Sequence, residues 1–482
     1  MNEPTKPFFF QALDALKLGD RRRAATLLRR QLLSGNTAEK NLPSVSQLAA
    51  HIGEIDLALE ASRRWRFGSI ESLLGCWALL GTYGRAADAL TEIERQPISI
   101  QEHPSTLHVR GTIAIQFGRF DEAQALFRRA LAKTPAALQT WFSLAMIKTF
   151  TPGDPDLAAM ERLEQSSAGA AADARSALCY GIGKAFEDLG DVDRAFAAYS
   201  RGAAIRRANE PFDSQSYRRA AEQVIREFTP TALEKLVPSR FEGRRSLFVA
   251  GLPRSGTTLT EQMLIGHSAV ADGAELNLFQ TALIPLLGNS HFAAVNYQQR
   301  SDRTDPWGEI ARDYAHLVDV RFRSPELVVD KSLGQSLQIG LMLHSMPDAR
   351  IAWLRRNPDD VALSCFRIYF STGLTWTRSL LDIADYMKAE DLLYEHWRSV
   401  YPDRILTVPY EELVRAPARW SEKLQRHFDL PIESGLETKP RSGRSVLTAS
   451  VGQVSEPIST ARIGQSAAFE RQLKPFRDRY YA

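Results

Sequence analysis

The sequence has few cysteines, little net charge and no long hydrophobic run. Its three cysteines, Cys76, Cys179 and Cys365, each lie among apolar neighbours and cannot form a disulfide framework. We therefore expect buried thiols, a reducing compartment and a cytoplasmic protein. The formal net charge of +3 is too small to indicate a nucleic-acid partner. No segment approaches the ~20 apolar residues of a membrane span, and the first residues lack the basic-then-apolar pattern of a signal peptide.

Metal-ligand patterns are also missing. The nine histidines contain no pair at a spacing such as His-x-x-x-His, and they do not cluster with the cysteines. We expect no metal centre. A length of 482 residues exceeds the ~250–300 residues at which single cores stop growing, so more than one domain is expected.

Small residues recur through the first 200 positions at a nearly constant interval. The glycines are spaced by 31 to 37 residues, and an alanine follows each of them five positions later. The glycines are Gly19, Gly53, Gly84, Gly118, Gly153 and Gly190, and the alanines are Ala24, Ala58, Ala89, Ala123, Ala158 and Ala195. A small residue at a turn and another where two helices touch suit a stacked helical hairpin.

This segment resembles tetratricopeptide repeats. The resemblance implies an α-solenoid of helical hairpins over residues 1–207, whose concave face commonly holds a peptide or protein. The copy around Pro152–Pro155 is degenerate, so the number of repeats stays open. Residues 208–243 are expected to be connecting helices, and a second domain to occupy residues 244–482.

The second domain begins with a strand, a glycine-rich loop and a helix. The apolar run 247–250 is followed by the turn Gly251–Gly256, and an amphipathic segment starts at Thr257. In this order, free backbone N–H groups and a helix N-terminus can hold an anion. A nucleotide triphosphatase would have lysine after Gly256, to reach the β- and γ-phosphates. Here Thr257 takes that place and Arg254 is the cation of the loop, which points away from ATP or GTP hydrolysis.

A second anion-binding pattern lies about 100 residues later. The apolar run 351–354 ends in Arg355-Arg356, Asn357 suits a helix N-cap, and proline follows at the first helical position. Ser364 falls on the same helix face as the start of that helix. Arg356 and Ser364 could therefore converge on one phosphate.

The two patterns together resemble the sulfotransferases that use 3′-phosphoadenosine 5′-phosphosulfate (PAPS). The resemblance implies a P-loop-like α/β domain of three layers with a parallel sheet, PAPS as co-substrate and no metal. It assigns the 5′-phosphosulfate loop to Pro253, Arg254, Ser255, Gly256, Thr257 and Thr258, and the 3′-phosphate to Arg356 and Ser364.

Further roles follow from the resemblance. Glu275, which lies 21 residues after Arg254, matches the general base of the tyrosylprotein sulfotransferases, with Glu261 as the weaker alternative. Lys331 matches the lysine that contacts the bridging and sulfuryl oxygens, and Ser450 the serine that donates to the leaving group. Tyr410 is either a nucleotide contact or a core residue.

The chain departs from the family pattern in two places. Ser332-Leu333-Gly334-Gln335 replaces a proline and an asparagine-like residue after Lys331. Gly464-Gln465-Ser466 stands where the family has a basic residue beside the 3′-phosphate, and Arg462 could substitute for that residue.

Three classes of function remain open. The first is a PAPS-dependent transfer to a hydroxyl, most simply a protein tyrosine that the repeats recruit. The second keeps this chemistry but has a carbohydrate or small-molecule acceptor, and the third is a non-catalytic repeat scaffold with a residual nucleotide site. Residues 285–325 are expected to form the acceptor side, and whether the protein is a homodimer stays open.

Overall fold

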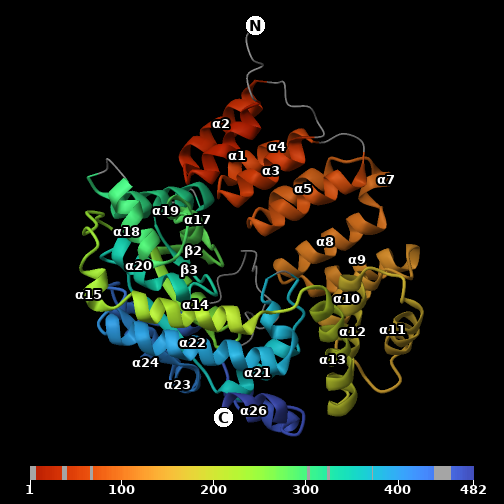
Figure 1. Ribbon diagram of the computed structural model, residues 1–482. Helices are drawn as coiled ribbons and strands as arrows, with labels where there is room; N and C mark the ends of the chain where they lie inside the picture. The colour runs from red at the N-terminus through yellow and green to blue at the C-terminus, as the bar shows by residue number, and fades with distance from the viewer. Residues whose placement is uncertain are drawn as a thin grey trace.

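The computed structural model describes residues 7–34, 41–65, 69–300, 304–322, 326–371, 373–438 and 458–482. Within these residues, six helical hairpins form an arc that leads into an α/β domain (Figure 1). The hairpins are α1 (Phe8–Lys17) with α2 (Arg21–Leu33), α3 (Leu42–His51) with α4 (Ile55–Arg64), α5 (Ile70–Thr82) with α6 (Ala86–Glu94), α8 (Pro104–Gln116) with α9 (Phe120–Lys133), α10 (Leu138–Ile147) with α11 (Pro155–Ser166), and α12 (Ala172–Asp188) with α13 (Val192–Asn209). The short helix α7 (Ile98–Gln101) lies between the third and fourth hairpins.

The recurring glycines make the turns of these hairpins. All six have φ angles between 70° and 81°, which favour glycine. In five hairpins the amide after the glycine donates to a carbonyl five residues earlier, as Asp20 N does to Ala15 O at 2.8 Å. This bond satisfies one of the free carbonyls at the end of the first helix.

The alanine prediction is confirmed in five hairpins and wrong in one. Ala24, Ala58, Ala89, Ala123 and Ala195 are fully buried. In the degenerate copy Ala158 is exposed, and Leu157 and Met160 are buried instead. The reason is that α10 ends six residues before Gly153, and the longer link that contains the buried Phe150 changes which face of α11 points inward.

The α/β domain is built on five parallel strands in the described part of the chain. Their order is β2-β3-β1-β4-β5, with β1 Ser246–Gly251, β2 Val270–Ala274, β3 Leu327–Asp330, β4 Ile351–Arg355 and β5 Ile405–Pro409. Side chains alternate between the faces of β1, so Val249 packs with α16 (Thr257–Ile265) and α24 (Pro417–His427), whereas Phe248 packs with α19 (Pro306–Phe322), α20 (Ile339–Ser345) and α22 (Leu380–Val400). The predicted three-layer fold with a parallel sheet is confirmed.

Shorter elements complete the domain. They are α17 (Leu278–Ala282), η2 (Ile284–Leu286), α18 (His291–Arg300), η3 (Ser336–Gln338), α21 (Pro358–Phe366), η4 (Thr375–Arg378), α23 (Tyr410–Arg415), η5 (Leu436–Thr438), η6 (Thr460–Arg462), η7 (Gln465–Phe469) and α26 (Lys474–Tyr480). Among the described residues, no helix combines the length and apolar character needed to cross a membrane.

The connecting helices lie on the α/β domain. They are α14 (Ser214–Glu227) and α15 (Pro230–Leu233), and α14 packs along α22. The Tyr217 ring of α14 stacks on Tyr386 with ring centroids 4.6 Å apart, and its hydroxyl donates to the buried Glu390. Residues 208–243 are therefore part of the covering of the sheet.

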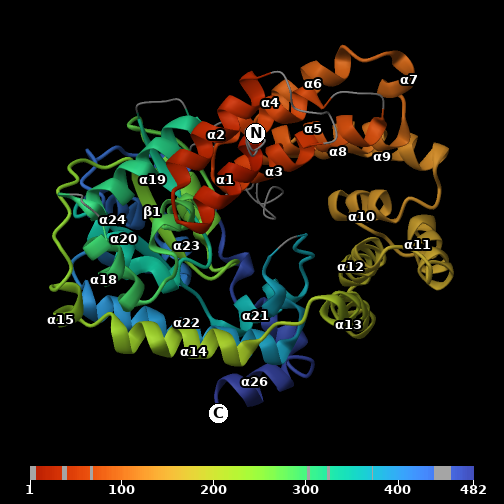
Figure 2. The ribbon, with the colours of Figure 1, turned by 45° about the horizontal axis from the view of Figure 1, so that its top comes forward.

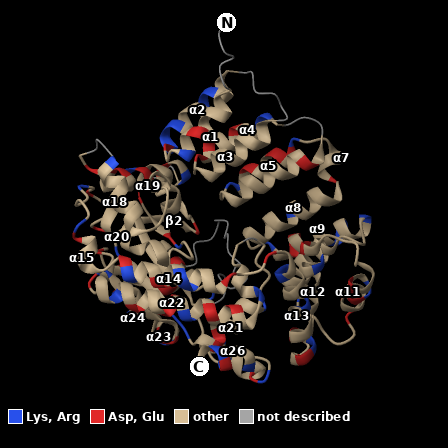
Figure 3. Ribbon diagram, viewed as in Figure 1, with Lys and Arg blue, Asp and Glu red and all other residues tan. Residues whose placement is uncertain are grey.

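The first end of the arc contacts α19 through buried charges. Arg21 of α2 donates to Glu54 at 3.0 Å and lies 3.5 Å from Asp313 of α19, while Arg22 donates to the same Asp313 at 2.6 Å. The turn at Gly53 also packs closely, because a Cβ there would lie 2.7 Å from the Leu317 side chain. The basic residues of α2 beside α19 are visible in Figure 3.

The last end of the arc returns to the α/β domain near α21 (Figure 2). The two share a hydrophobic core, in which Phe127, Ile182 and Tyr199 of the hairpins lie together with Leu363 and Met387. Phe196 of α13 stacks on Phe366 with ring centroids 5.1 Å apart. Arg206 donates to the backbone carbonyl of Ser371 at 3.0 Å. The arc is thus anchored at both ends.

Candidate active site

The predicted site residues come together at the carboxyl edge of the parallel sheet. They follow the five strands in turn: Arg254 after β1, Glu275 after β2, Lys331 after β3, Arg356 after β4 and Tyr410 after β5. In the sheet, β2 and β3 lie on one side of β1, and the later strands β4 and β5 lie on the other side. The loop after β1 therefore lies where the strand order reverses, the usual ligand-binding place in open α/β sheets.

The loop after β1 is held in an unusual and tightly packed conformation. The φ angles are 134° at Gly251, 70° at Arg254 and 106° at Gly256. A Cβ on Gly251 would lie 2.8 Å from the carbonyl oxygen of Leu354, and one on Gly256 would lie 2.5 Å from the Tyr410 ring. Both glycines are thus required by backbone conformation and by close packing. The loop ends where α16 begins, as the sequence predicts.

The other predicted loop residues are largely buried. The Ser255 hydroxyl donates to Leu252 O at 2.7 Å, which closes the turn from inside. Pro253 and Thr257 are buried, and Thr258 is half-buried.

Four arginines surround this loop. Burial lowers the pKa of Arg254 to about 10, and the positive charges of Arg367, Arg462 and Arg356 act in the same direction. Arg254 is thus a desolvated cation among other cations. Such a group is well suited to an anionic ligand.

Arg356 and Ser364 meet through Arg254. Nη1 of Arg356 donates to the carbonyl oxygen of Arg254 at 3.0 Å, and Nε of Arg254 donates to the Ser364 hydroxyl at 3.0 Å. The Arg356 guanidinium also lies over the buried Tyr410 ring, 4.5 Å from its centroid. Nε of Arg356 is buried and has no hydrogen-bond partner among the described residues. The structure brings both residues to the loop, and their joint contact with a phosphate stays a prediction.

The C-terminal segment is tied to the start of α21. Asp360 accepts hydrogen bonds from the amides of Gly464 at 2.8 Å and Ser466 at 2.9 Å. Burial raises the pKa of Asp360, but these amides and the nearby Arg356 outweigh it and lower the pKa. The carbonyl of Arg462 accepts from Arg356, which places Arg462 beside the loop. Ser450 lies outside the described residues.

Lys331 lies between the two candidate base residues. Its Nζ is 2.7 Å from Oε1 of Glu275 and 3.7 Å from Oε2 of Glu261. The Lys331 and Glu261 side chains are 1% and 3% exposed, whereas that of Glu275 is 40% exposed. Glu275 is therefore the carboxylate that an acceptor can reach.

A buried network holds the segment after Lys331. Asp330 accepts from the Ser332 amide at 3.0 Å, and its Oδ2 is 2.8 Å from the Tyr314 hydroxyl. The Ser332 hydroxyl accepts from the Asn277 amide at 2.7 Å. Burial raises the pKa of Asp330 to about 6. Ser332 thus makes a backbone contact that a proline, which has no N–H, could not make.

Sequence reasoning missed Arg367 and its partner. Arg367 donates to Glu187 of α12 at 2.6 Å and to Gln465 at 2.8 Å. Its position three residues after Ser364, on the same helix face, could have suggested a place near the site. Nothing in the sequence connects it with Glu187, which comes from the arc.

The segment 285–325 has a structural role that the sequence did not reveal. Trp307 and Tyr314 are buried against the sheet. Asp313 faces Arg21 and Arg22 of the arc. Within the described part of this segment, α19 therefore packs against both the sheet and the arc.

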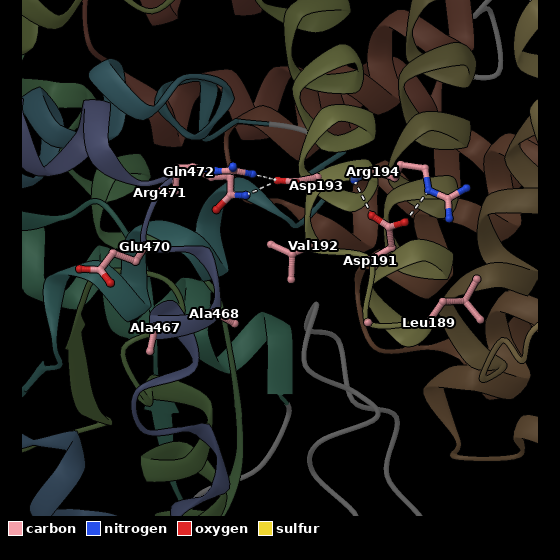
Figure 4. Close-up of a pocket in the computed structure, with 11 residues that line it drawn as sticks. Leu189, Asp191, Val192, Asp193, Arg194, Ala467, Ala468, Glu470, Arg471 and Gln472 are labelled. Atoms are coloured by element: carbon pink, nitrogen blue, oxygen red, sulfur yellow. Dashed lines mark hydrogen bonds and ion pairs between the residues drawn. The ribbon is translucent and has the colours of Figure 1, made fainter.

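A polar cavity lies between the α12–α13 turn and η7 with the residues that follow it (Figure 4). Asp193 accepts from Gln472 at 2.6 Å and also from Arg471, while Asp191 pairs with Arg194. None of the predicted site residues lines this cavity. Among the described residues, no group of three or more His, Cys, Asp or Glu side chains could hold a metal ion.

Comparison with known proteins identifies the α/β domain. A family model described as the sulfotransferase family matches residues 246–434. An uncharacterized protein of Aquifex aeolicus is 26% identical over 404 residues, which are 81% of this chain and 51% of that protein. A protein-tyrosine sulfotransferase of Drosophila melanogaster is 25% identical over 197 residues, 38% of each chain. This chain thus spans about half, or less, of the length of these relatives.

Among solved structures, the sulfotransferase domain of the Synechococcus PCC 7002 olefin synthase is similar, with 21% identity and a TM-score of 0.33, over 50% of this chain and 98% of that domain. Because the family model covers the sheet and the loop around which the four arginines gather, residues 246–434 belong to the sulfotransferase family.

Proposed function

We propose that this protein transfers a sulfuryl group from PAPS to an acceptor hydroxyl. The observation that carries the proposal is the group of four arginines around a phosphate-type loop that has no P-loop lysine. Burial and the neighbouring cations lower the pKa of Arg254 to about 10, so a ligand that brings negative charge would relieve the repulsion. PAPS supplies the activated sulfuryl group and two separate phosphate groups.

The residues present suit a donor with two anionic ends. The loop 253–258 and the N-terminus of α16 would hold the 5′-phosphosulfate. Arg356, Ser364 and Arg462 would hold the 3′-phosphate, and the buried Arg356 Nε, which lacks a partner among the described residues, supports this role. Tyr410 would then act mainly by orienting Arg356, whose guanidinium lies over the Tyr410 ring.

Glu275 would act as general base. Acceptor phenols have a pKa near ~10, so at neutral pH a carboxylate that accepts the hydroxyl proton would accelerate transfer. Glu275 is partly exposed and 2.7 Å from Lys331, so a proton can reach it from the solvent side. Lys331 would stabilise negative charge on the transferred group, and Ser450 would donate to the leaving group.

The acceptor that we favour is a tyrosine in a peptide or protein. The support is the similarity to the Drosophila protein-tyrosine sulfotransferase over 38% of the chain. The arc, as tetratricopeptide-like repeats anchored at both ends to the α/β domain, would recruit the peptide. The three cysteines are buried and form no disulfide bond with one another, which suits a reducing compartment, and we place the protein in the cytoplasm.

Transfer of ³⁵S from labelled PAPS tests this function. We expect label in tyrosine-containing peptides and none in the matched peptides with phenylalanine. Label that appears only in carbohydrate or small molecules of a cell lysate would change the acceptor class. Absence of label in every fraction, under conditions where PAPS binds, would contradict the proposal.

A further inference from the structure

Lys331 has a second carboxylate neighbour that the proposed reaction does not use. We propose that Glu261 is a positioning residue, which keeps Lys331 in place when Glu275 takes up the acceptor proton. This inference rests on the proposed function. It concerns a different residue, however, and has its own readout.

The geometry indicates that Glu261 positions Lys331 and does not itself contact the acceptor. Glu261 lies on α16, one turn after the phosphate-type loop, and its side chain is 3% exposed. An acceptor in solvent therefore cannot approach it as it can approach Glu275, which is 40% exposed. Oε2 of Glu261 is nevertheless 3.7 Å from the Lys331 ammonium.

The backbone of β2 makes room for this carboxylate. A Cβ on Gly273 would lie 2.9 Å from Oε1 of Glu261 and 3.2 Å from its Cγ. The same Cβ would lie 2.9 Å from Cβ of Val329 on β3, so a side chain at this position would crowd both Glu261 and the neighbouring strand. A glycine therefore stands where Glu261 approaches the strand, two residues before Glu275.

The charges explain why two carboxylates are useful. Lys331 is 1% exposed, and a buried ammonium without a counter-charge is strongly unfavourable. When Glu275 accepts the proton of the hydroxyl, it becomes neutral and its ion pair with Lys331 ends. Glu261 takes no part in this proton transfer, so in the proposal it remains the counter-ion of Lys331 and keeps the ammonium directed at the reacting group.

Chemical labelling of Lys331 tests the inference without turnover. Glu275→Gln imitates the protonated base, and with Glu261 present we expect reductive methylation of Lys331, measured by mass spectrometry, to stay within about twofold of wild type. In the double variant Glu261→Gln/Glu275→Gln, Lys331 loses both counter-charges and should be labelled roughly tenfold faster. Equal labelling of the single and double variants would overturn the proposal.

Turnover provides the second readout. Glu261→Gln should lower kcat by roughly 10- to 100-fold, because the buried ammonium of Lys331 loses the counter-charge that lies 3.7 Å from it, with donor Kd and acceptor KM within about twofold. Glu261→Asp should recover part of the loss because it keeps the charge. Unchanged kcat in Glu261→Gln, or equal loss of donor affinity, would refute positioning.

Asp313→Asn is the matched control, since it also removes a buried ion-paired carboxylate but lies where α19 meets the arc. It should reduce the melting temperature and leave kcat unchanged. If the wild-type protein transfers no sulfuryl group at all, the proposed function fails, while the labelling comparison still decides the role of Glu261.

Discussion

Removing the charge of Arg254 should make the fold more stable and the donor site weaker. Arg254 is a desolvated cation beside Arg356, Arg367 and Arg462, and this environment lowers its pKa to about 10. The ordinary pKa of arginine exceeds 12, and a difference of two or more pKa units corresponds to about 3 kcal/mol. Because the pKa is lowered in the folded state, this cost to stability is present at all pH values below about 10 and disappears only as the pH rises above that value.

Arg254→Met removes the charge and keeps a long side chain. It also removes the charge-assisted hydrogen bond to Ser364, which costs about 2 kcal/mol. The expected net gain in the free energy of unfolding is about 1 kcal/mol, or roughly 2–4 °C in Tm if the α/β domain unfolds as one unit.

Thermal unfolding with and without 3′-phosphoadenosine 5′-phosphate measures both effects. Without ligand, the variant should melt at a higher temperature than wild type. Ligand at about 100 times its Kd adds about 2.7 kcal/mol to the free energy of unfolding of the wild-type protein, and this increase should be largely lost in the variant. A variant that is less stable than wild type without ligand, or that keeps the full ligand effect, would refute the reasoning about repulsion.

The remaining predictions concern the base, the buried aspartate and the arc. Glu275→Gln should lower turnover by roughly 10²–10⁴-fold with little change in donor affinity, measured by ³⁵S transfer and calorimetry; near-normal turnover would exclude Glu275 as the base. The pKa of Asp330 is about 6 in the folded state and 3.8 in the unfolded state, so the free energy of unfolding should fall as the pH rises between these values. In denaturant titrations, Asp330→Asn should remove this slope and add up to about 3 kcal/mol to the free energy of unfolding at pH 7. A slope that is unchanged in Asp330→Asn would contradict the assignment. A fragment that starts at Phe241 should aggregate in size-exclusion chromatography because it loses Tyr217 and the core shared with α13, whereas one that starts at Ala172 should stay monomeric and bind donor; a monomeric Phe241 fragment would show that the shared core is dispensable.

Periodicity and turn chemistry were enough to predict the hairpins. The glycines had to sit in turns because each follows a helix end and adopts positive φ, and the alanines were predictable wherever the spacing between helix end and glycine stayed constant. The prediction failed at Ala158, where α10 ends six residues before Gly153. A regular repeat in sequence does not determine helix phase across a turn of different length.

The positions of those site residues that directly follow a strand could be predicted from the sequence. Because all five strands are parallel, a residue that follows each of them must reach the same edge, and this is where Arg254, Glu275, Lys331 and Arg356 lie. Contacts between distant segments carry no such local pattern. The Glu187–Arg367 pair joins residues 180 positions apart, and Glu261 approaches Lys331 only because Gly273 has no side chain.

The contacts that anchor the arc to the α/β domain could not be predicted from the sequence. The residues that fix it, such as Arg21 and Arg206, lie in helices whose local sequence gives no sign of these contacts. Their partners are Asp313 and backbone carbonyls of the α/β domain. For this reason the fragment test compares a cut before the α/β domain with a cut before α12.

Selectivity for the 3′-phosphate tests the central claim most directly. Isothermal titration should show 3′-phosphoadenosine 5′-phosphate binding far more tightly than ADP, AMP or ATP. Arg356→Ala should weaken that binding by about 10- to 150-fold, the value of one charge-assisted contact, and leave ADP nearly unaffected. Equal affinity of the wild-type protein for ADP and 3′-phosphoadenosine 5′-phosphate would contradict a PAPS-dependent enzyme.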